Sequence, residues 1–160
     1  MDARPAKDSQ ATLAHWMGPL DANGAGFVHG GTVMKLCDEA AGLAAIKHSH
    51  RRVVTASMDR MTFMVPLHVS ELVTFQASVN AVWHTSMEVG VRVDTENPRS
   101  GERRHSNSAY FTMVAVDDDG RPVPVAPLLT DSDAERRREG EAQLRRRNRL
   151  AEREQIQAAR

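Results

Sequence analysis

Hydrophobic and polar residues change their spacing along the chain, and the change predicts one long helix followed by strands. Over residues 31–48 the apolar side chains cover most of a helical circumference, which is typical of a buried helix. Four later segments alternate apolar and polar residues, as strands do: 52–65, 71–83, 86–95 and 106–116. A helix followed by an antiparallel meander indicates an α+β fold whose sheet wraps the buried helix.

The two ends of the chain have other patterns. Residues 1–10 are polar and are expected to form a disordered leader, and residues 12–20 suggest a short first strand. Residues 131–160 carry nine arginines, seven acids and few apolar side chains. This composition predicts a solvated helical extension that packs weakly and lies on the surface of an oligomer. The globular domain is therefore expected over residues 11–130.

Composition narrows the possible functions. The single cysteine, Cys37, excludes an internal disulfide framework and a multi-cysteine zinc site. Twenty-one basic residues balance twenty-one acidic ones, and no aromatic residue follows Phe111, so nucleic acid is not an expected partner. No apolar run is long enough to span a bilayer, and the N-terminus lacks the apolar stretch of a signal peptide. We expect a cytoplasmic protein without a membrane partner.

An acidic residue within the predicted buried helix, Asp38, is the first candidate for chemistry, because an unpaired buried carboxylate is costly. It either reaches a groove or structural partner, or it serves as a general base or nucleophile. Gly30 and Gly31 open the same helix, whose first N–H groups can stabilise an oxyanion. Asn23, in the preceding loop, can orient a water or a carbonyl. Together these residues suit hydrolysis or transfer at an acyl carbonyl.

The spacing of these groups indicates a dimer. Eight residues separate Gly30 from Asp38, which is about 12 Å at helical rise. One acyl carbon cannot lie about 3 Å from both an oxyanion donor and a nucleophile so placed. Two antiparallel helices related by a two-fold axis could place Gly30 and Asn23 of one subunit opposite Asp38 of the other. The sequence thus predicts two sites at a dimer interface.

These residues form part of a longer pattern that resembles a known family. The pattern is Asn23-Gly24-x-Gly26-x-x-His29-Gly30-Gly31, then six residues, then Asp38-Glu39-Ala40. It resembles the acyl-CoA thioesterases of the hotdog fold, and in particular the cytosolic long-chain acyl-CoA hydrolase group, whose vertebrate members carry two such domains in tandem. The likeness covers residues of about 12 to 130 and includes the segments 54–59, 85–89, 108–112 and 119–124.

The resemblance implies a fold, an assembly and a reaction. In this family an antiparallel sheet wraps a long central helix, dimers form a continuous sheet, and dimers often assemble into hexamers as trimers of dimers. Asp38 and Asn23 correspond to the family's catalytic pair, which tandem enzymes divide between their two halves. This single-domain chain has both, so a homodimer would make two complete sites. The implied substrate is acyl-CoA, with coenzyme A leaving as product and no metal or redox cofactor.

Other residues are weaker candidates, each with a structural alternative. His29 could touch substrate, or it could pack or cap its loop. The hydroxyls of Thr55, Ser57, Thr85 and Ser86 could bind the pantetheine amides. The phosphates of coenzyme A could be met by Arg60, Arg103 and Arg104, although these could equally be ordinary surface arginines. Cys37 is expected to be a small buried hydrophobe, and Glu39 to form a structural ion pair.

We therefore expect thioester hydrolysis of acyl-CoA to fatty acid and coenzyme A. One rival is a hotdog module that binds acyl-CoA as a sensor without turning it over, but such a module has no use for a carboxylate in this position. Another is an acyl-CoA hydratase or dehydratase on the same fold. Those enzymes usually combine histidine with aspartate in a different motif, which is absent here.

Overall fold

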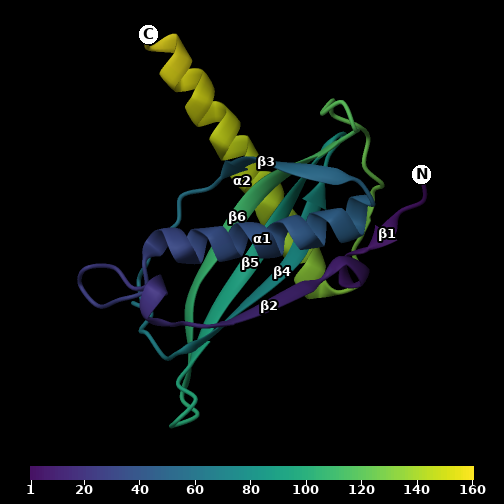
Figure 1. The fold of residues 1–160 in the computed structure, drawn as a ribbon. Coiled ribbons are helices and arrows are strands. Elements are labelled where there is room, and N and C mark those ends of the chain that lie inside the picture. The colour runs from purple at the N-terminus through teal and green to yellow at the C-terminus, as the bar shows by residue number, and fades with distance from the viewer.

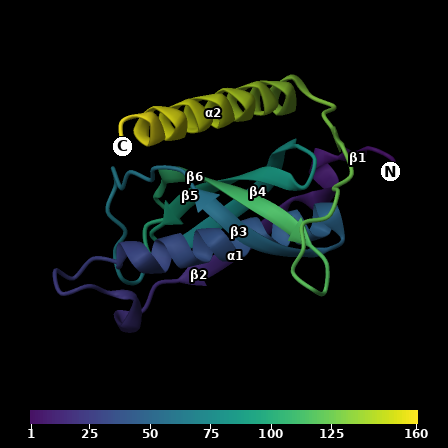
Figure 2. The ribbon, with the colours of Figure 1, turned by 90° about the horizontal axis from the view of Figure 1, so that it is seen from above.

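Five antiparallel strands form one curled sheet with a long helix on each face (Figure 1). The computed structural model describes residues 1–160. The sheet order is β2-β4-β5-β6-β3, with β2 (Ala11–Trp16), β3 (Arg52–Met58), β4 (Leu72–Val82), β5 (Ser86–Glu96) and β6 (Arg103–Val116). Helix α1 (Gly30–Ser49) lies on one face and α2 (Asp133–Ala158) on the other (Figure 2). The predicted α+β architecture is confirmed.

Small side chains on α1 let the helix approach the sheet closely. The helix buries Val33, Cys37 and four alanines against the inward-facing side chains of β4, β5 and β6. The largest of those inward side chains are Phe75, Phe111 and Met113. Both β2 and β3 are edge strands, so each has an unpaired side in the single chain.

The prediction that α1 is buried all round is wrong for the single chain. Leu43 and Ile46 are 43% and 45% exposed, and Val54 on the edge strand β3 is 50% exposed. The sheet covers only one side of the helix, so apolar residues on the other side remain in water. An exposed apolar helix side next to an unpaired strand edge is a surface suited to a second copy of the chain.

Two segments differ from their predicted structure. The strand expected over 52–65 stops at Met58, because residues 59–71 leave the sheet and run toward the N-terminus of α1. The expected leader has regular structure instead of disorder: β1 (Arg4–Pro5) pairs with β7 (Leu128–Leu129), and a 3-10 helix, η1, covers Ala6–Ser9. Ala6 and Ser9 are buried, and small residues such as these gave no apolar signal.

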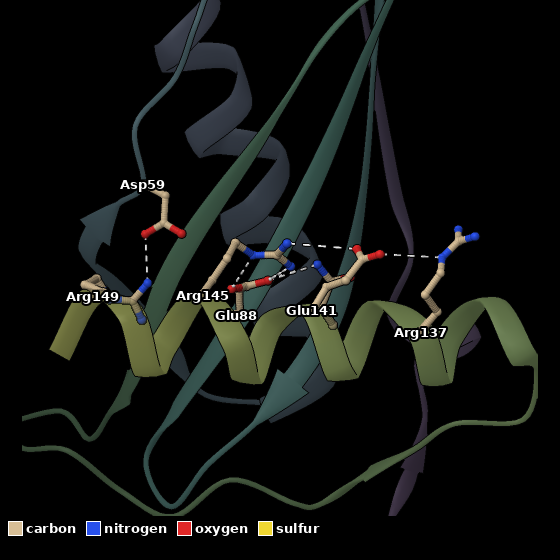
Figure 3. Close-up of polar contacts among 7 residues, drawn as sticks. Asp59, Glu88, Arg137, Glu141, Arg145 and Arg149 are labelled. Carbon is tan, nitrogen blue, oxygen red and sulfur yellow. Dashed lines mark hydrogen bonds and ion pairs between the residues drawn. The ribbon is translucent and has the colours of Figure 1, made fainter. Parts of the chain in front are cut away.

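The C-terminal helix packs more firmly than its composition predicted. Ser132 and Glu135 form a capping box at its start, and Ala142 is fully buried. Arg145 reaches the outer face of the sheet, where its Nη2 lies 2.7 Å from Oε1 of the buried Glu88 (Figure 3). Most of α2 is exposed, as its composition predicted, and the contacts that fix it to the sheet are polar and leave no apolar stripe along the helix.

No helix in the structure combines the length and apolar character needed to cross a membrane.

Candidate active site

The carboxylate of Asp38 faces the edge strand β3 from the middle of α1. Thr55 Oγ1 donates a hydrogen bond to Asp38 Oδ1 at 2.5 Å, and the same hydroxyl lies 3.4 Å from the sulfur of Met113. Asp38 is only partly buried, because β3 is the edge strand and no further strand covers the helix beyond it. One carboxylate oxygen is held by Thr55, and the other remains available to a substrate or a water.

A β-bulge in β3 separates Thr55 from Ser57. Thr55 lies opposite the inward-facing Met113, whereas Ser57 lies opposite Thr112, and Ala56 is the extra residue between them. Paired residues of neighbouring strands project from the same face of a sheet, and Thr112 is on the outer face. Ser57 therefore points away from Asp38. The sequence spacing of Thr55 and Ser57 placed both on one face of the strand, but in the structure they lie on opposite faces of the sheet.

Asn23 is fixed by its own loop. Its Oδ1 accepts hydrogen bonds from the N–H of Ala25 at 2.9 Å and of Phe27 at 3.2 Å. Because both bonds use the carbonyl oxygen of the side chain, the amide Nδ2 is free to donate. The Asn23 side chain is exposed, so its amide group is accessible to a ligand or to a second chain.

The first turn of α1 presents one free N–H group. His29 is the N-cap, and its Nδ1 accepts the hydrogen bond of the Gly31 N–H at 3.0 Å. The Gly30 N–H makes no hydrogen bond within the chain. The Gly31 N–H is therefore already used in this structure, and His29 serves as a cap, which was the structural alternative for that residue. Gly30 is the available oxyanion donor.

The donor and the carboxylate stay apart within one chain. Helix α1 is continuous from Gly30 to Ser49, so eight residues of regular helix, about 12 Å, separate Gly30 from Asp38. The structure thus gives two half-sites at different places on one helix. Each half-site is accessible from the side of the molecule that the sheet leaves uncovered.

The arginines considered for coenzyme A are paired with acidic residues. Arg60 pairs with Glu152 of α2, and Arg103 lies 3.3 Å from Glu96. Arg104 donates to Glu71 at 2.7 Å, and the Glu71 side chain is only 11% exposed. Burial alone would raise the pKa of Glu71, but the hydrogen bonds from the His68 N–H and from Arg104, together with the charge of Arg104, outweigh it and lower the pKa. Arg104 therefore has a structural partner.

The remaining sequence candidates lie elsewhere. Thr85 and Ser86 lie where β4 turns into β5, and Ser86 projects from the face opposite the inward Met87. Cys37 is fully buried, and burial, helped by the charge of Asp38, raises its pKa to about 12. It is therefore a buried thiol and not a nucleophile. Glu39 pairs with Lys35 at 3.8 Å on the helix surface.

Two features were not foreseen from the sequence. Thr55 was expected to bind substrate, yet it contacts Asp38 directly. Phe63, in the segment after β3, lies against the first turn of α1, and a Cβ added at Gly30 would be 3.4 Å from the Phe63 ring. Both contacts join residues that are far apart in the chain, so no local sequence pattern predicts them. No group of three or more His, Cys, Asp or Glu side chains is placed to hold a metal ion.

The chain is similar in sequence to proteins of one known family. Residues 25–102 match the model of the thioesterase superfamily. The chain is 37% identical over 132 residues to the cytosolic acyl coenzyme A thioester hydrolase of Rattus norvegicus, covering 81% of this chain and 35% of that protein. It thus spans about a third of the length of that relative. It is 34% identical to the uncharacterized acyl-CoA thioester hydrolase YkhA of Bacillus subtilis, covering 84% of this chain and 78% of that protein.

Solved structures extend the likeness to the whole chain. An apo hexameric acyl-CoA thioesterase superposes with a TM-score of 0.91 at 35% identity, covering 95% of this chain and 97% of that one. An acyl-CoA hydrolase from Staphylococcus aureus, solved with butyryl coenzyme A and coenzyme A, has a TM-score of 0.89 at 29% identity, covering 98% and 96%. Alanine variants of that hydrolase replace an asparagine, an aspartate and a threonine at the same intervals as Asn23, Asp38 and Thr55.

Proposed function

Because the chain belongs to the hotdog-fold acyl-CoA thioesterase family, we propose that it hydrolyses fatty acyl-CoA to a free fatty acid and coenzyme A. The observation that carries the proposal is the Asp38–Thr55 hydrogen bond, with Asn23 and the free Gly30 N–H at the other half-site. An oriented carboxylate and an oxyanion donor are the groups that acyl transfer to water requires.

In the proposed reaction the Gly30 N–H donates to the thioester oxygen and stabilises the negative charge that develops there. The free oxygen of Asp38 either takes the proton of an attacking water or attacks the thioester carbon itself. In the first route Asn23 holds the water through Nδ2, the C–S bond breaks, and the sulfur leaves with the proton that Asp38 took up. In the second route the attack of Asp38 breaks the C–S bond and expels coenzyme A as its thiolate. Water then hydrolyses the acyl-aspartate to the fatty acid and the free Asp38 carboxylate, and the proton released protonates the thiolate.

The proposed catalytic unit is a two-fold dimer. Antiparallel packing of two α1 helices would bring Asp38 of one chain to Gly30 and Asn23 of the other, which the distance along one helix forbids within a single chain. The exposed Leu43 and Ile46 and the open edge of β3 support this contact. The hexameric relative supports assembly as a trimer of dimers. We also propose a cytosolic location, as the name of the rat relative indicates for that protein.

The testing experiment is a thiol-release assay on acyl-CoAs from acetyl to palmitoyl. The wild type is compared with Asp38→Asn, and acyl-CoA binding is measured for both proteins. Release by the wild type that the variant abolishes, with binding retained, supports the proposal. Binding without release at any chain length by the wild type would contradict hydrolysis and favour the acyl-CoA sensor.

A further inference from the structure

The segment that leaves β3 for the N-terminus of α1 begins at an ion pair with α2. Asp59 directly follows β3, and its N–H donates to the Tyr110 carbonyl at 2.9 Å. Arg149 of α2 donates to Asp59 Oδ1 at 2.8 Å (Figure 3). The two side chains are 27% and 21% exposed, so water and salt screen this pair less than a fully exposed one.

Beyond Asp59 the segment has few contacts that fix it. No backbone hydrogen bond involves residues 60–64. Arg60 pairs with Glu152 of α2, and Met61 packs against the core. The next hydrogen bond runs from Ser106 Oγ to the Val65 carbonyl at 3.2 Å. Helix α2 therefore contributes two of the polar contacts that hold residues 59–65, one at the start of the segment and one just after it.

Neighbouring contacts fix α2 itself against the sheet at this point. One turn before Arg149, Arg145 makes two hydrogen bonds to Glu88, and its guanidinium lies 3.7 Å from the centre of the Tyr110 ring. Asn80 donates to the same Glu88 at 3.2 Å. Since Tyr110 also accepts the Asp59 N–H, the helix and the start of the segment share one rigid support on β6.

The segment of residues 59–65 places Phe63 beside Gly30 of the proposed site. Its ring lies in van der Waals contact with the first turn of α1, next to Gly30. The proposed function assigns the Gly30 N–H to the thioester oxygen. The ring is 46% exposed and covers one side of the first turn at Gly30. An apolar ring beside this N–H lowers the local dielectric and so strengthens a hydrogen bond from the N–H to a developing oxyanion. The position of Phe63 therefore affects the proposed oxyanion donor directly.

We propose that α2 is a positioning element for the reaction, acting through the Asp59–Arg149 pair on residues 59–65 and so on Phe63 beside Gly30. The inference rests on the proposed function, which gives the Gly30 N–H its role. Arg149 acts only through Asp59 and the segment, so it is a positioning residue and not a catalytic one. The C-terminal helix thereby gains a part in the reaction although it lies on the far face of the sheet from α1.

The experiment compares Arg149→Ala with Arg147→Ala, an exposed arginine on the same helix for which the structure shows no ion pair. Arg149→Ala is expected to lower kcat/KM about tenfold, since small displacements at a reacting centre are costly. The control should match the wild type, and both variants should have similar melting temperatures. In a Phe63→Ala background, Arg149→Ala should cause no further loss. Reversing the pair, with Asp59→Arg and Arg149→Asp together, should restore most of the activity.

A second measurement separates the anchoring from the chemistry. Trypsin cleavage after Arg60, followed by mass spectrometry of the native protein, should be faster in Arg149→Ala than in Arg147→Ala. Equal cleavage rates, or a loss of kcat/KM that adds in full to that of Phe63→Ala, would overturn the positioning role while thioester hydrolysis stands. A wild type that hydrolyses no acyl-CoA would instead remove the proposed function and the catalytic part of this inference together.

Discussion

Thr55 on the edge strand β3 holds the carboxylate of Asp38 on α1 through a hydrogen bond of 2.5 Å. The contact joins the helix to the strand at the open edge of the sheet, where a second chain could add its own residues. It also leaves one oxygen of Asp38 without a partner. In the proposed reaction the two residues would act as one group, in which the threonine sets the orientation and the aspartate supplies the reactive oxygen.

Replacing Asp38 by asparagine should abolish the base while keeping the shape of the side chain. We expect kcat for acyl-CoA hydrolysis to fall by about a thousandfold, within the range that a positioned general base contributes. Acyl-CoA binding, measured by calorimetry, should remain close to that of the wild type. A variant with near wild-type turnover would refute the role of Asp38.

Replacing Thr55 by alanine should release the Asp38 carboxylate from its fixed orientation. Hydrogen bonds to charged groups contribute about 1.5–3 kcal/mol, so we expect kcat to fall by at least about tenfold. Thr55→Ser keeps the hydroxyl and is the matched control, which should retain most of the activity. Equal losses in the two variants would show that the methyl group, and not the hydrogen bond, is what matters.

Mixing two inactive variants tests whether the site lies between chains. Asn23→Ala and Asp38→Asn each remove one half-site, and a heterodimer of the two would contain one site with both residues intact. After subunit exchange we expect about a quarter of the wild-type activity per site, since random pairing makes that fraction of sites complete. If each chain formed its own site, the mixture would stay inactive.

The Glu88–Arg145 pair should contribute to folding stability. Glu88 is fully buried, so Arg145→Met leaves a buried carboxylate without its counter-charge, at a cost of about 3 kcal/mol in unfolding free energy. Adding Glu88→Leu to that variant removes the unpaired charge and should recover most of the loss. Urea unfolding of the wild type and the two variants measures both effects. A double variant no more stable than Arg145→Met alone would contradict this account.

Glu71 should make stability depend on acidic pH. Its pKa is lower in the folded protein than its ordinary value of 4.5, so its contribution is fully present above pH 4.5. The contribution is then lost as the pH falls through the lowered pKa, because the folded state must take up a proton that the unfolded state already binds. Thermal unfolding of Glu71→Gln across this range should show a flatter acid limb than the wild type. Parallel curves for the two proteins would argue against this role.

Periodicity predicted the main elements well because one face of each element is buried. The helix expected over 31–48 is α1, Gly30–Ser49, and the strand expected over 71–83 is β4, Leu72–Val82. The candidate site residues Asp38, Gly30 and Gly31 also stand out in the sequence, because a carboxylate inside an apolar helix and a glycine pair at its start are local features. In contrast, the partner of Asp38 lies on another element, and sequence spacing could not identify Thr55 as that partner.

Several differences from the expectations come from polar contacts between residues far apart in the chain, and one comes from an irregularity within a strand. Arg60 and Arg104 each have an acidic partner that sequence spacing could not reveal, because Glu152 and Glu71 are distant in sequence. The α2 helix looked weakly packed because its anchor is an arginine bonded to a buried glutamate, which leaves no apolar periodicity. Ser57 was grouped with Thr55 because strict alternation puts them on one face, and a bulge adds a residue without changing composition.

That bulge also determines which changes of length this part of the chain tolerates. Ala56 separates the part of β3 that presents Thr55 to Asp38 from the part that ends at Asp59, where Arg149 binds. Ala56 is the unpaired extra residue, so substituting or deleting it leaves Thr55 opposite Met113 and Ser57 opposite Thr112. Deleting a paired residue of β3, such as Val54, would instead shift one part of the strand by a residue and turn over its faces. Natural variants should therefore accept a deletion at Ala56 but not at the paired positions of β3.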